Sequence, residues 1–227
     1  MKMYSGKKVH ALCTFVSVAG VAWFLTGCAS PGYKKSNAAA AGVQNAALEV
    51  QAESRTLDLT VGALRDLVNQ PTGDLRQPYR HFCSSLNQFE AEARRAETSG
   101  RRMAERHAAY LQSWDKEAAG IEYQHVRDLS QNRKTEVANQ FGTVRRRYEE
   151  SQAAVQPLIA YLEDIRKALG TDLTPAGIES LKEVSQNADT NAAKVQTALT
   201  ALTTALQESG ATMSSLAFQH TNSQATP

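Results

Sequence analysis

Residues 82–114 read FCSSLNQFEAEARRAETSGRRMAERHAAYLQSW, and their apolar side chains recur at alternating steps of four and three residues. Such steps average about 3.5 residues, which aligns the side chains in one stripe along an α-helix. The positions of the stripe are Phe82, Leu86, Phe89, Ala93, Ala96, Gly100, Met103, His107, Tyr110 and Trp114. The stretch therefore predicts a long helix with one buried face. If this helix starts between Asp74 and Pro78 and has roughly 45 residues, it would reach about 65 to 70 Å at 1.5 Å per residue.

The same spacing returns in three other segments, from Val43 to Val68, from Val137 to Leu169 and from Ile178 to Leu206. In the first of them Ser54 is a polar interruption of the stripe. Four segments that share one period predict an all-α fold. We expect long antiparallel helices with heptad seams that form an elongated, coiled-coil-like bundle of three to four helices.

Helix-breaking residues separate these segments. Pro71 and Gly73 end the first, and Asp74 or Gln77 is expected to cap the second. Between Gly120 and Asn132 the apolar pattern weakens and polar residues predict a turn. Thr174-Pro175 is a good start for the fourth segment, with Thr174 as the cap. Pro157 lies inside the third segment and predicts a kink or a change in packing.

The first 28 residues have a basic start, an apolar stretch over about 11–24 and the exit Leu25-Thr26-Gly27-Cys28. The apolar stretch is shorter than the ~20 residues that span a bilayer, which indicates a secretory signal. The exit resembles the bacterial lipobox, and this resemblance implies cleavage before Cys28 and lipidation of its thiol. The alternative is an uncleaved signal anchor with a chance cysteine. Ala29, where inner-membrane lipoproteins typically carry Asp, favours the outer membrane.

These observations divide the chain into four parts. Residues 1–27 are expected to be a lipoprotein signal peptide, and residues 28–37, which contain Pro31 and Gly32, a short acylated tether. Residues 38–208 form the helical domain. Residues 209–227 are rich in Ser, Thr, Gln and Asn and are expected to be a disordered tail.

Charge and cysteine content narrow the classes of function. The chain has 25 basic and 23 acidic residues, and loss of Lys2, Lys7 and Lys8 with the signal would leave 22 against 23. A balance near zero gives no overall reason to expect nucleic acid. Cys83 would then be the only thiol beyond Cys28, so an intramolecular disulfide framework is excluded.

Arginines provide the main candidate site. Arg101 and Arg102, with Arg145, Arg146 and Arg147, could bind an anionic partner such as a polymer or a lipid headgroup. Arg94, Arg95 and Arg106 extend this basic stripe. The competing interpretation, which we favour, is a solvated face that neutralises itself, because acidic residues stand four positions away, as in Arg101 with Glu105 and Glu90 with Arg94.

The remaining histidines, cysteine and aromatic residues are expected to have structural roles rather than functional ones. His81, His107 and His125 lack the one-turn spacing of a metal site, and His107 occupies the stripe, so no metal is expected. Cys83 is expected to be a partly buried thiol rather than a cross-linking site, and Trp114 and Tyr148 to be anchors of the seam. We recognise no group of catalytic residues and no cofactor motif in the sequence. We therefore expect that the protein is not an enzyme and binds no cofactor.

Several elements resemble an uncharacterised family of predicted bacterial lipoproteins that carries a domain-of-unknown-function label. They are Gly73-Asp74-Leu75, Trp114 with Glu117, Arg127 with Ser130, Arg145-Arg146-Arg147-Tyr148, Pro157 with Leu162, and Leu169 through Ile178-Glu179-Ser180-Leu181. They span about residues 55–206. The resemblance implies a helical, coiled-coil-like domain behind a lipoprotein signal, and it implies no activity. Pro78 and Cys83 depart from the family pattern.

The sequence therefore predicts a noncatalytic cell-envelope protein, anchored to a membrane through Cys28 and facing the periplasm. Its helices would act as a scaffold, a spacer or a docking surface for a protein partner, with a homo-oligomer as a further option. The alternative is an accessory module that binds an anionic envelope polymer or lipid headgroups through its arginines. Nucleic-acid binding would require the export signal to be spurious.

Overall fold

The computed structural model describes residues 31–69 and 73–214, and in these ranges every regular element is an α-helix. The four long helices are α1 (Pro31–Asn69), α2 (Arg76–Ala118), α3 (Gln124–Thr171) and α5 (Lys182–Met213), and a short α4 (Pro175–Ser180) connects α3 to α5. The prediction of an all-α bundle of long helices is confirmed.

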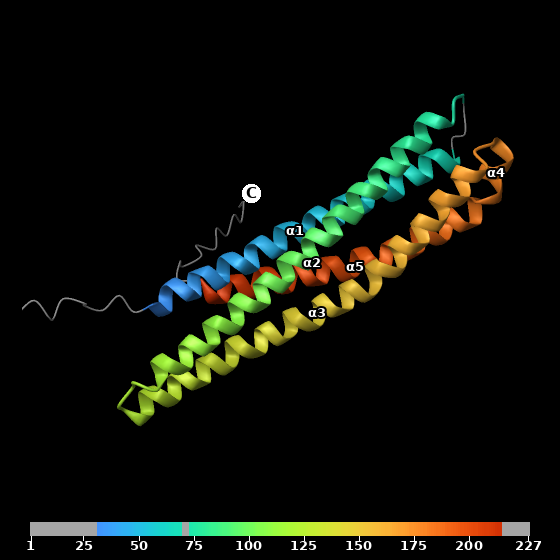
Figure 1. Cartoon of the computed structure of the whole chain (residues 1–227). Helices are drawn as coiled ribbons and strands as arrows, with labels where there is room; N and C mark the ends of the chain where they lie inside the picture. The colour runs from blue at the N-terminus through green and yellow to red at the C-terminus, as the bar shows by residue number, and fades with distance from the viewer. Residues whose placement is uncertain (1–30, 70–72, 215–227) are drawn as a thin grey trace, which may run out of the picture. The chain divides into compact units, whose positions relative to one another are not determined.

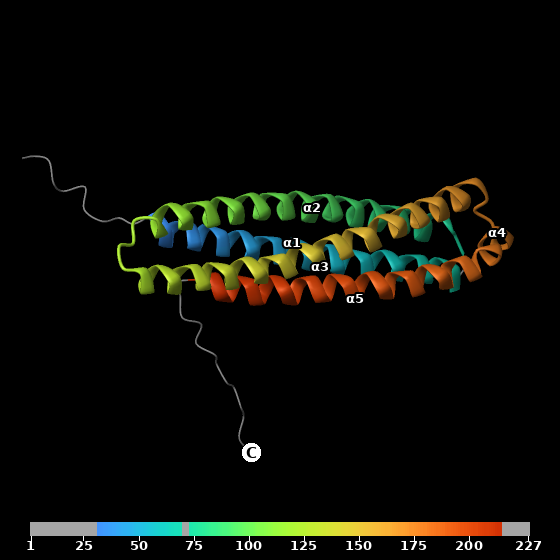
Figure 2. The same ribbon diagram turned by 90° about the horizontal axis from the view of Figure 1, so that it is seen from below.

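Each long helix packs against two others and runs antiparallel to both (Figures 1 and 2). α1 lies against α2 and α5, and α3 lies against the same two helices, so the order around the bundle is α1, α2, α3, α5. The chain therefore passes up, down, up and down. The apolar seams of the four helices meet within one chain. The sequence alone does not show whether they close within one chain or between two.

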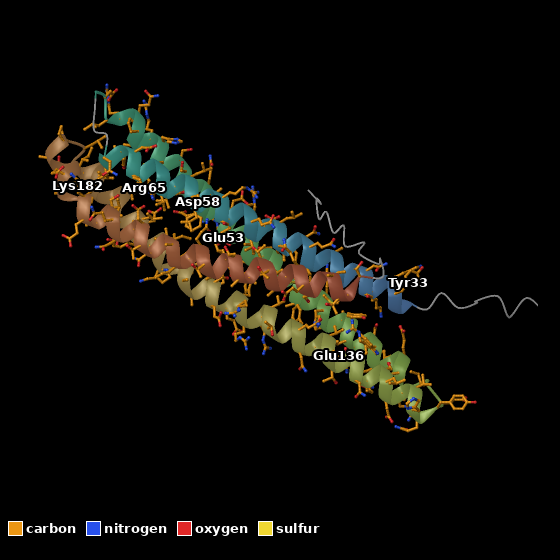
Figure 3. The ribbon with its side chains drawn as sticks, turned by 180° about the vertical axis from the view of Figure 1, so that it is seen from behind. Tyr33, Glu53, Asp58, Arg65, Glu136 and Lys182 are labelled. Atoms are coloured by element: carbon orange, nitrogen blue, oxygen red, sulfur yellow. The ribbon has the colours of Figure 1, made fainter. Side chains whose placement is uncertain are left out.

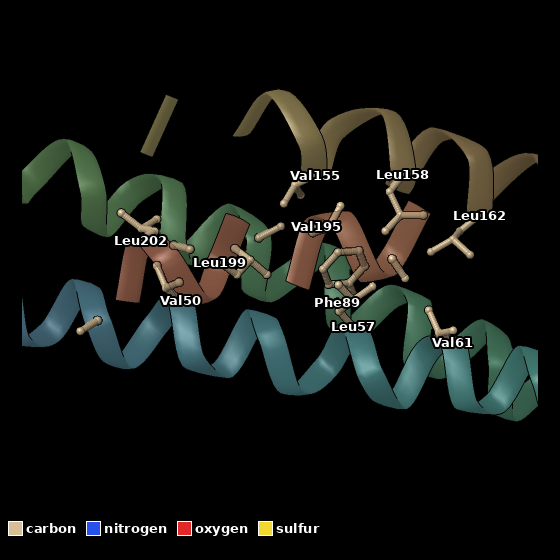
Figure 4. Packing of buried hydrophobic residues seen from close by; sticks show 14 of the residues in the cluster. Val50, Leu57, Val61, Phe89, Val155, Leu158, Leu162, Val195, Leu199 and Leu202 are labelled. Atoms are coloured by element: carbon tan, nitrogen blue, oxygen red, sulfur yellow. The ribbon is translucent and has the colours of Figure 1, made fainter. Parts of the chain in front are cut away.

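The core lies along the predicted seams. The α2 stripe is buried from Phe82 to His107, whereas Tyr110 and Trp114 are half-buried. Figure 4 shows how side chains from all four helices meet, with Leu57 of α1 beside Phe89 of α2 and with Val50 and Val61 further along α1 on either side. The opposite wall is formed by residues of α3 and α5, namely Val155, Leu158, Leu162, Val195, Leu199 and Leu202.

α1 buries a second stripe that the sequence analysis missed. Beside the predicted stripe, Ala46, Glu53, Thr60 and Leu67 are also buried, whereas Ser54 is only half-buried. The reason is the position of α1, which must cover α2 on one side and α5 on the other. Steps of three and four residues through Val50, Glu53 and Leu57 give this second seam.

The tether expected over residues 28–37 is wrong from Pro31 onward, because α1 begins there. Proline is tolerated at the first helical position, where its missing N–H would have no partner in any case. Ala39 and Ala40 are already buried, and the Ser36 hydroxyl donates to the carbonyl of Met213 in the last turn of α5. Packing against α5 therefore extends the helix backward.

The tail begins later than residue 209. α5 continues to Met213, and Ser209, Gly210 and Met213 are buried against the bundle. A Cβ at Gly210 would lie 3.5 Å from Val43 Cγ1, so α1 supplies the surface that keeps this polar segment helical. Residues 215–227 lie outside the described ranges.

The connections between the helices are shorter than the sequence predicted. The turn expected over Gly120–Asn132 is confined to residues 119–123, because the polar residues that follow form exposed turns of α3. Thr174 caps α4 as predicted, since its Oγ1 accepts a hydrogen bond from Gly177 N at 3.1 Å. The predicted fourth helix is divided at Leu181 into α4 and α5.

Of the other predicted breakers, Gly73 lies in the turn before α2, whereas Pro157 lies inside α3, which continues through it without interruption. Gly73 has a φ of 72°, the left-handed geometry that favours glycine. The predicted cap at Asp74 or Gln77 is wrong, because Leu75 is the N-cap residue of α2 and Gln77 lies inside the helix. Asp74 Oδ1 still accepts a hydrogen bond from Arg76 N at 3.0 Å. Pro157 is tolerated inside α3 because it lies on the exposed face together with Ala153, whose carbonyl would otherwise accept its missing bond.

Candidate functional site

A groove of about 650 Å³ runs between the first half of α1 and the middle of α2. Four arginines of α2 line one side, namely Arg94, Arg95, Arg102 and Arg106. The other side is formed by α1 residues that include Gly42, Asn45, Leu48 and Glu49. Guanidinium groups that share a groove can bind anionic groups such as phosphate or carboxylate.

Gly42 allows one of these arginines to lie close to α1. A Cβ at this position would stand 3.2 Å from Cδ of Arg106, which is tighter than ordinary contact. The absence of a side chain at Gly42 therefore lets the aliphatic part of Arg106 rest on the backbone of α1. This contact narrows the groove at that level.

Two of the four arginines form ion pairs with carboxylates of α2, and two do not. Arg94 pairs with Glu90 at 3.6 Å and Arg95 pairs with Glu92 at 2.5 Å, in both cases on the same helix. Arg102 and Arg106 form no ion pair within 4.0 Å in the part of the chain that the structure describes, although Glu49 lines the same groove. Arg102 and Arg106 are therefore the groups best able to accept an external anion.

The five predicted arginines do not form one site. Arg102 lies in the α1–α2 groove, whereas Arg101 and Arg145 line a smaller hollow of about 260 Å³ between α2 and α3. Arg145 and Arg146 pair with Glu149 and Glu150 at 3.8 and 3.9 Å, and Arg147 pairs with Glu150 at 2.8 Å. The self-neutralising interpretation thus fits the α3 cluster, whereas Arg101 and Arg102 form no ion pair within 4.0 Å among the described residues.

Glu53 is the most unusual side chain of the core. It is completely buried midway along α1, and neither carboxyl oxygen has a hydrogen-bond partner among the described residues (Figure 3). Burial, together with the charge of the Glu92 carboxylate, raises its pKa to about 7. The group is therefore largely protonated in mildly acidic solution.

Tyr148 of α3 shares this level of the bundle with Glu53. Its hydroxyl donates to the carbonyl of Ala96 at 3.2 Å, and burial, together with the charge of Glu53, raises the pKa of the phenol. A Cβ at Gly100 would stand 2.5 Å from Cε2 of Tyr148, so the aromatic ring fills the space that glycine leaves on α2. Tyr148 is an anchor between α2 and α3, as predicted.

His107 is a packed residue of the seam. Its imidazole stacks on Phe141 of α3 with ring centroids 3.7 Å apart and an angle of 8° between the planes. Burial lowers its pKa to about 4, against the effect of a hydrogen bond to the backbone of Val137. The side chain is therefore neutral at physiological pH.

The other sequence candidates are placed as follows. Trp114 Nε1 donates to Ser130 Oγ at 2.8 Å and joins α2 to α3, while Cys83 is half-buried near the start of α2. Within residues 31–69 and 73–214, no three His, Cys, Asp or Glu side chains are gathered so that they could hold a metal ion. Cys28 lies outside the described residues.

A comparison with family models matches residues 26–216 to the proteins of unknown function termed DUF2959. The chain belongs to this family. The match covers all five helices and includes Cys28. No curated protein and no solved structure matches the chain. None of the helices in the described part of this family member is long and apolar enough to cross a bilayer.

We expect Glu53→Gln to remove a pH dependence of stability. The carboxyl ionises near pH 4.5 in the unfolded chain and near pH 7 in the bundle, so between these values only the native state keeps the proton. The free energy of unfolding of the wild-type chain should therefore fall by about 3 kcal/mol relative to the variant as the pH rises through this window. Urea unfolding at a series of pH values measures the difference.

His107 acts in the opposite direction, because its lowered pKa makes stability fall as the pH decreases from about 6.5 to about 4. Both chains contain His107, so its contribution cancels in the difference. A difference between wild type and Glu53→Gln that does not change with pH would contradict the assignment of Glu53.

Proposed function

We propose that this chain is a lipid-anchored cell-envelope protein whose helical bundle acts as a noncatalytic scaffold, spacer or protein-docking surface. The acyl group would be carried by Cys28, and the outer membrane, with the bundle facing the periplasm, is the favoured location. The protein partner would be recognised by the exposed helix faces, in a monomer or a homo-oligomer.

The observation that carries this proposal is the short distance between anchor and fold. α1 begins at Pro31, so only Ala29 and Ser30 separate Cys28 from the bundle. A lipid on Cys28 would hold a stiff body of long helices directly at the membrane surface rather than on a flexible leash. Several acyl chains hold a protein firmly, whereas one holds it marginally.

The side-chain chemistry supports a structural role. Most ion pairs of the described residues join neighbours three or four positions apart on one helix, such as Arg95 with Glu92 and Arg147 with Glu150. The buried polar groups Glu53 and His107 are placed by helix packing. Both side chains are buried between helices of the bundle, and no ligand is needed to account for their position.

Metabolic labelling with radioactive palmitate tests the anchor. We expect the wild-type chain to incorporate label and to sediment with membranes, and the Cys28→Ala variant to do neither. A matched Cys83→Ser variant should be labelled like the wild type, because it keeps Cys28 and loses only a half-buried thiol of the bundle. Equal labelling of the wild type and Cys28→Ala would overturn the proposal.

A second candidate function is binding of an anionic polymer or headgroup, and the groove between α1 and α2 favours it. Arg102 and Arg106 face this groove without an ion-pair partner in the described ranges. Charge attraction at an exposed groove weakens with salt, since the Debye length falls to about 8 Å at physiological ionic strength. Nucleic acid is not proposed as the partner.

Charge reversal distinguishes a site from general attraction. In Arg102→Glu/Arg106→Glu we expect binding of soluble polyphosphate to weaken at least about tenfold, because two charge-assisted contacts are lost. Arg145→Glu/Arg146→Glu changes the net charge equally but lies outside the groove, so it should weaken binding far less. Titrations at low and high salt give the comparison, and equal losses in both variants would count against the groove.

A further inference from the structure

Exposed apolar side chains gather at one end of the bundle. Of the six large hydrophobic residues that are exposed in the described ranges, three belong to the α2–α3 tip, which we define as residues 119–129. They are Tyr123, Val126 and Leu129, with exposed fractions of 77%, 49% and 57%. Tyr33, 57% exposed, is a fourth and lies in the first turn of α1.

The start of α1 and the α2–α3 tip lie at the same end of the bundle (Figure 1; Tyr33 is labelled in Figure 3). A Cβ at Gly32 would stand 2.5 Å from Oε2 of Glu117, which belongs to the last turn of α2. The four exposed apolar side chains therefore share the end of the bundle at which the chain enters from Cys28.

The tip is a fixed structure. The guanidinium of Arg127 donates through Nε and Nη2 to the carbonyl of Ile121, at 3.0 and 2.5 Å, and Arg127 N donates to the carbonyl of Tyr123 at 3.0 Å. Below it, Trp114 is bonded to Ser130 and Lys134 pairs with Asp115. The apolar groups are thus held outward by a closed hydrogen-bonded turn.

The sequence limits how far this end can be from an anchored Cys28. Three residue steps separate Cys28 from Pro31, and a fully extended chain spans at most about 3.6 Å per residue, or roughly 11 Å. If the acyl chains of Cys28 are in a bilayer, the first turn of α1 lies within that reach of the interface. Tyr33 then stands at the depth where the rings of tyrosine are enriched.

The chemistry of the tip fits a lipid interface. Tyr123 combines an apolar ring with a hydroxyl that can stay hydrated, while Val126 and Leu129 gain free energy by leaving water. Nearby charges of both signs, such as Lys116 and Glu117, or Arg127 and Asp128, offset one another. The contact should therefore depend on apolar burial and little on salt.

We propose that the α2–α3 tip inserts Tyr123, Val126 and Leu129 into the headgroup region of the bilayer that holds Cys28. The bundle stands on the membrane with this end down, supported by the lipid anchor and by the tip. This inference rests on the proposed lipid anchor for its location, but its occupant, a lipid surface, can be tested separately.

A fluorescence experiment on the full acylated chain tests the proposal. In a Cys83→Ser background, an environment-sensitive dye is attached to Tyr123→Cys, Leu129→Cys or the control Leu59→Cys. Leu59 of α1 is 58% exposed, which matches Leu129, but it lies far along α1 from the tip. The proteins are reconstituted in vesicles of phosphatidylethanolamine and phosphatidylglycerol.

We expect dyes at positions 123 and 129 to emit at shorter wavelength, to be quenched by nitroxide-labelled lipid and to resist aqueous iodide, at low and at high salt. The dye at position 59 should remain open to iodide. The proposal is overturned if positions 123 and 129 are as open to iodide as position 59 while the protein stays bound to the vesicles. Shielding of the tip only after envelope proteins are added would also overturn it, in favour of a protein occupant.

A chain without acyl groups on Cys28 can be told apart from a tip that does not insert into the membrane. Mass spectrometry of the same samples shows whether Cys28 carries acyl groups, and an unmodified Cys28 would contradict the proposed function. The labelled Cys28→Ala chain is then mixed with the same vesicles at high lipid concentration. A lipid-dependent shift at position 129, without one at position 59, supports the tip even then, and equal behaviour of the two positions overturns it.

Discussion

The bundle depends on α1 burying two sides at once, one against α2 and the other against α5. A helix in this position needs a wide apolar face, and the polar residues that fall on it must find partners within the core. Thr60 does so by donating to the carbonyl of Thr56 at 2.7 Å, whereas Glu53 has no such bond. Its carboxyl is accommodated by keeping its proton, which ties the stability of the bundle to pH.

Much of the fold follows from the sequence because its main seams are regular. The α2 stripe was predicted residue by residue from Phe82 to His107, and the α3 stripe was predicted to run from Val137 to Leu169, both of which are buried. The second α1 seam was not predicted, because Glu53 and Thr60 break its apolar pattern and only contact with α5 explains their burial. Helix ends were misplaced because Pro31 is a helix breaker everywhere except at the first helical position, which it occupies, and because polar Ser209 stays helical through packing that the sequence does not show.

The arginines show where sequence reasoning stops for the candidate site. Spacing alone identified pairs such as Glu90 with Arg94, which the structure brings to 3.6 Å. It also suggested Arg101 with Glu105, which form no ion pair within 4.0 Å among the described residues. Which arginines share a groove depends on the rotation of α2 against α1 and α3. Arg102 and Arg106 fall on the α1 side, and Arg101 falls on the α3 side.

Four helices of one chain close the core, with α1 between α2 and α5. Ser54 of α1 and Gln196 of α5 are in contact, with their side-chain oxygens 2.8 Å apart, and a short bismaleimide should join cysteines at these two positions when Cys83 is replaced by serine. Because α1 packs against α5 of the same chain, we expect a cross-linked product with the mass of a single chain at every protein concentration. A product with the mass of two chains would contradict it, because α1 would then pack against α5 of another molecule.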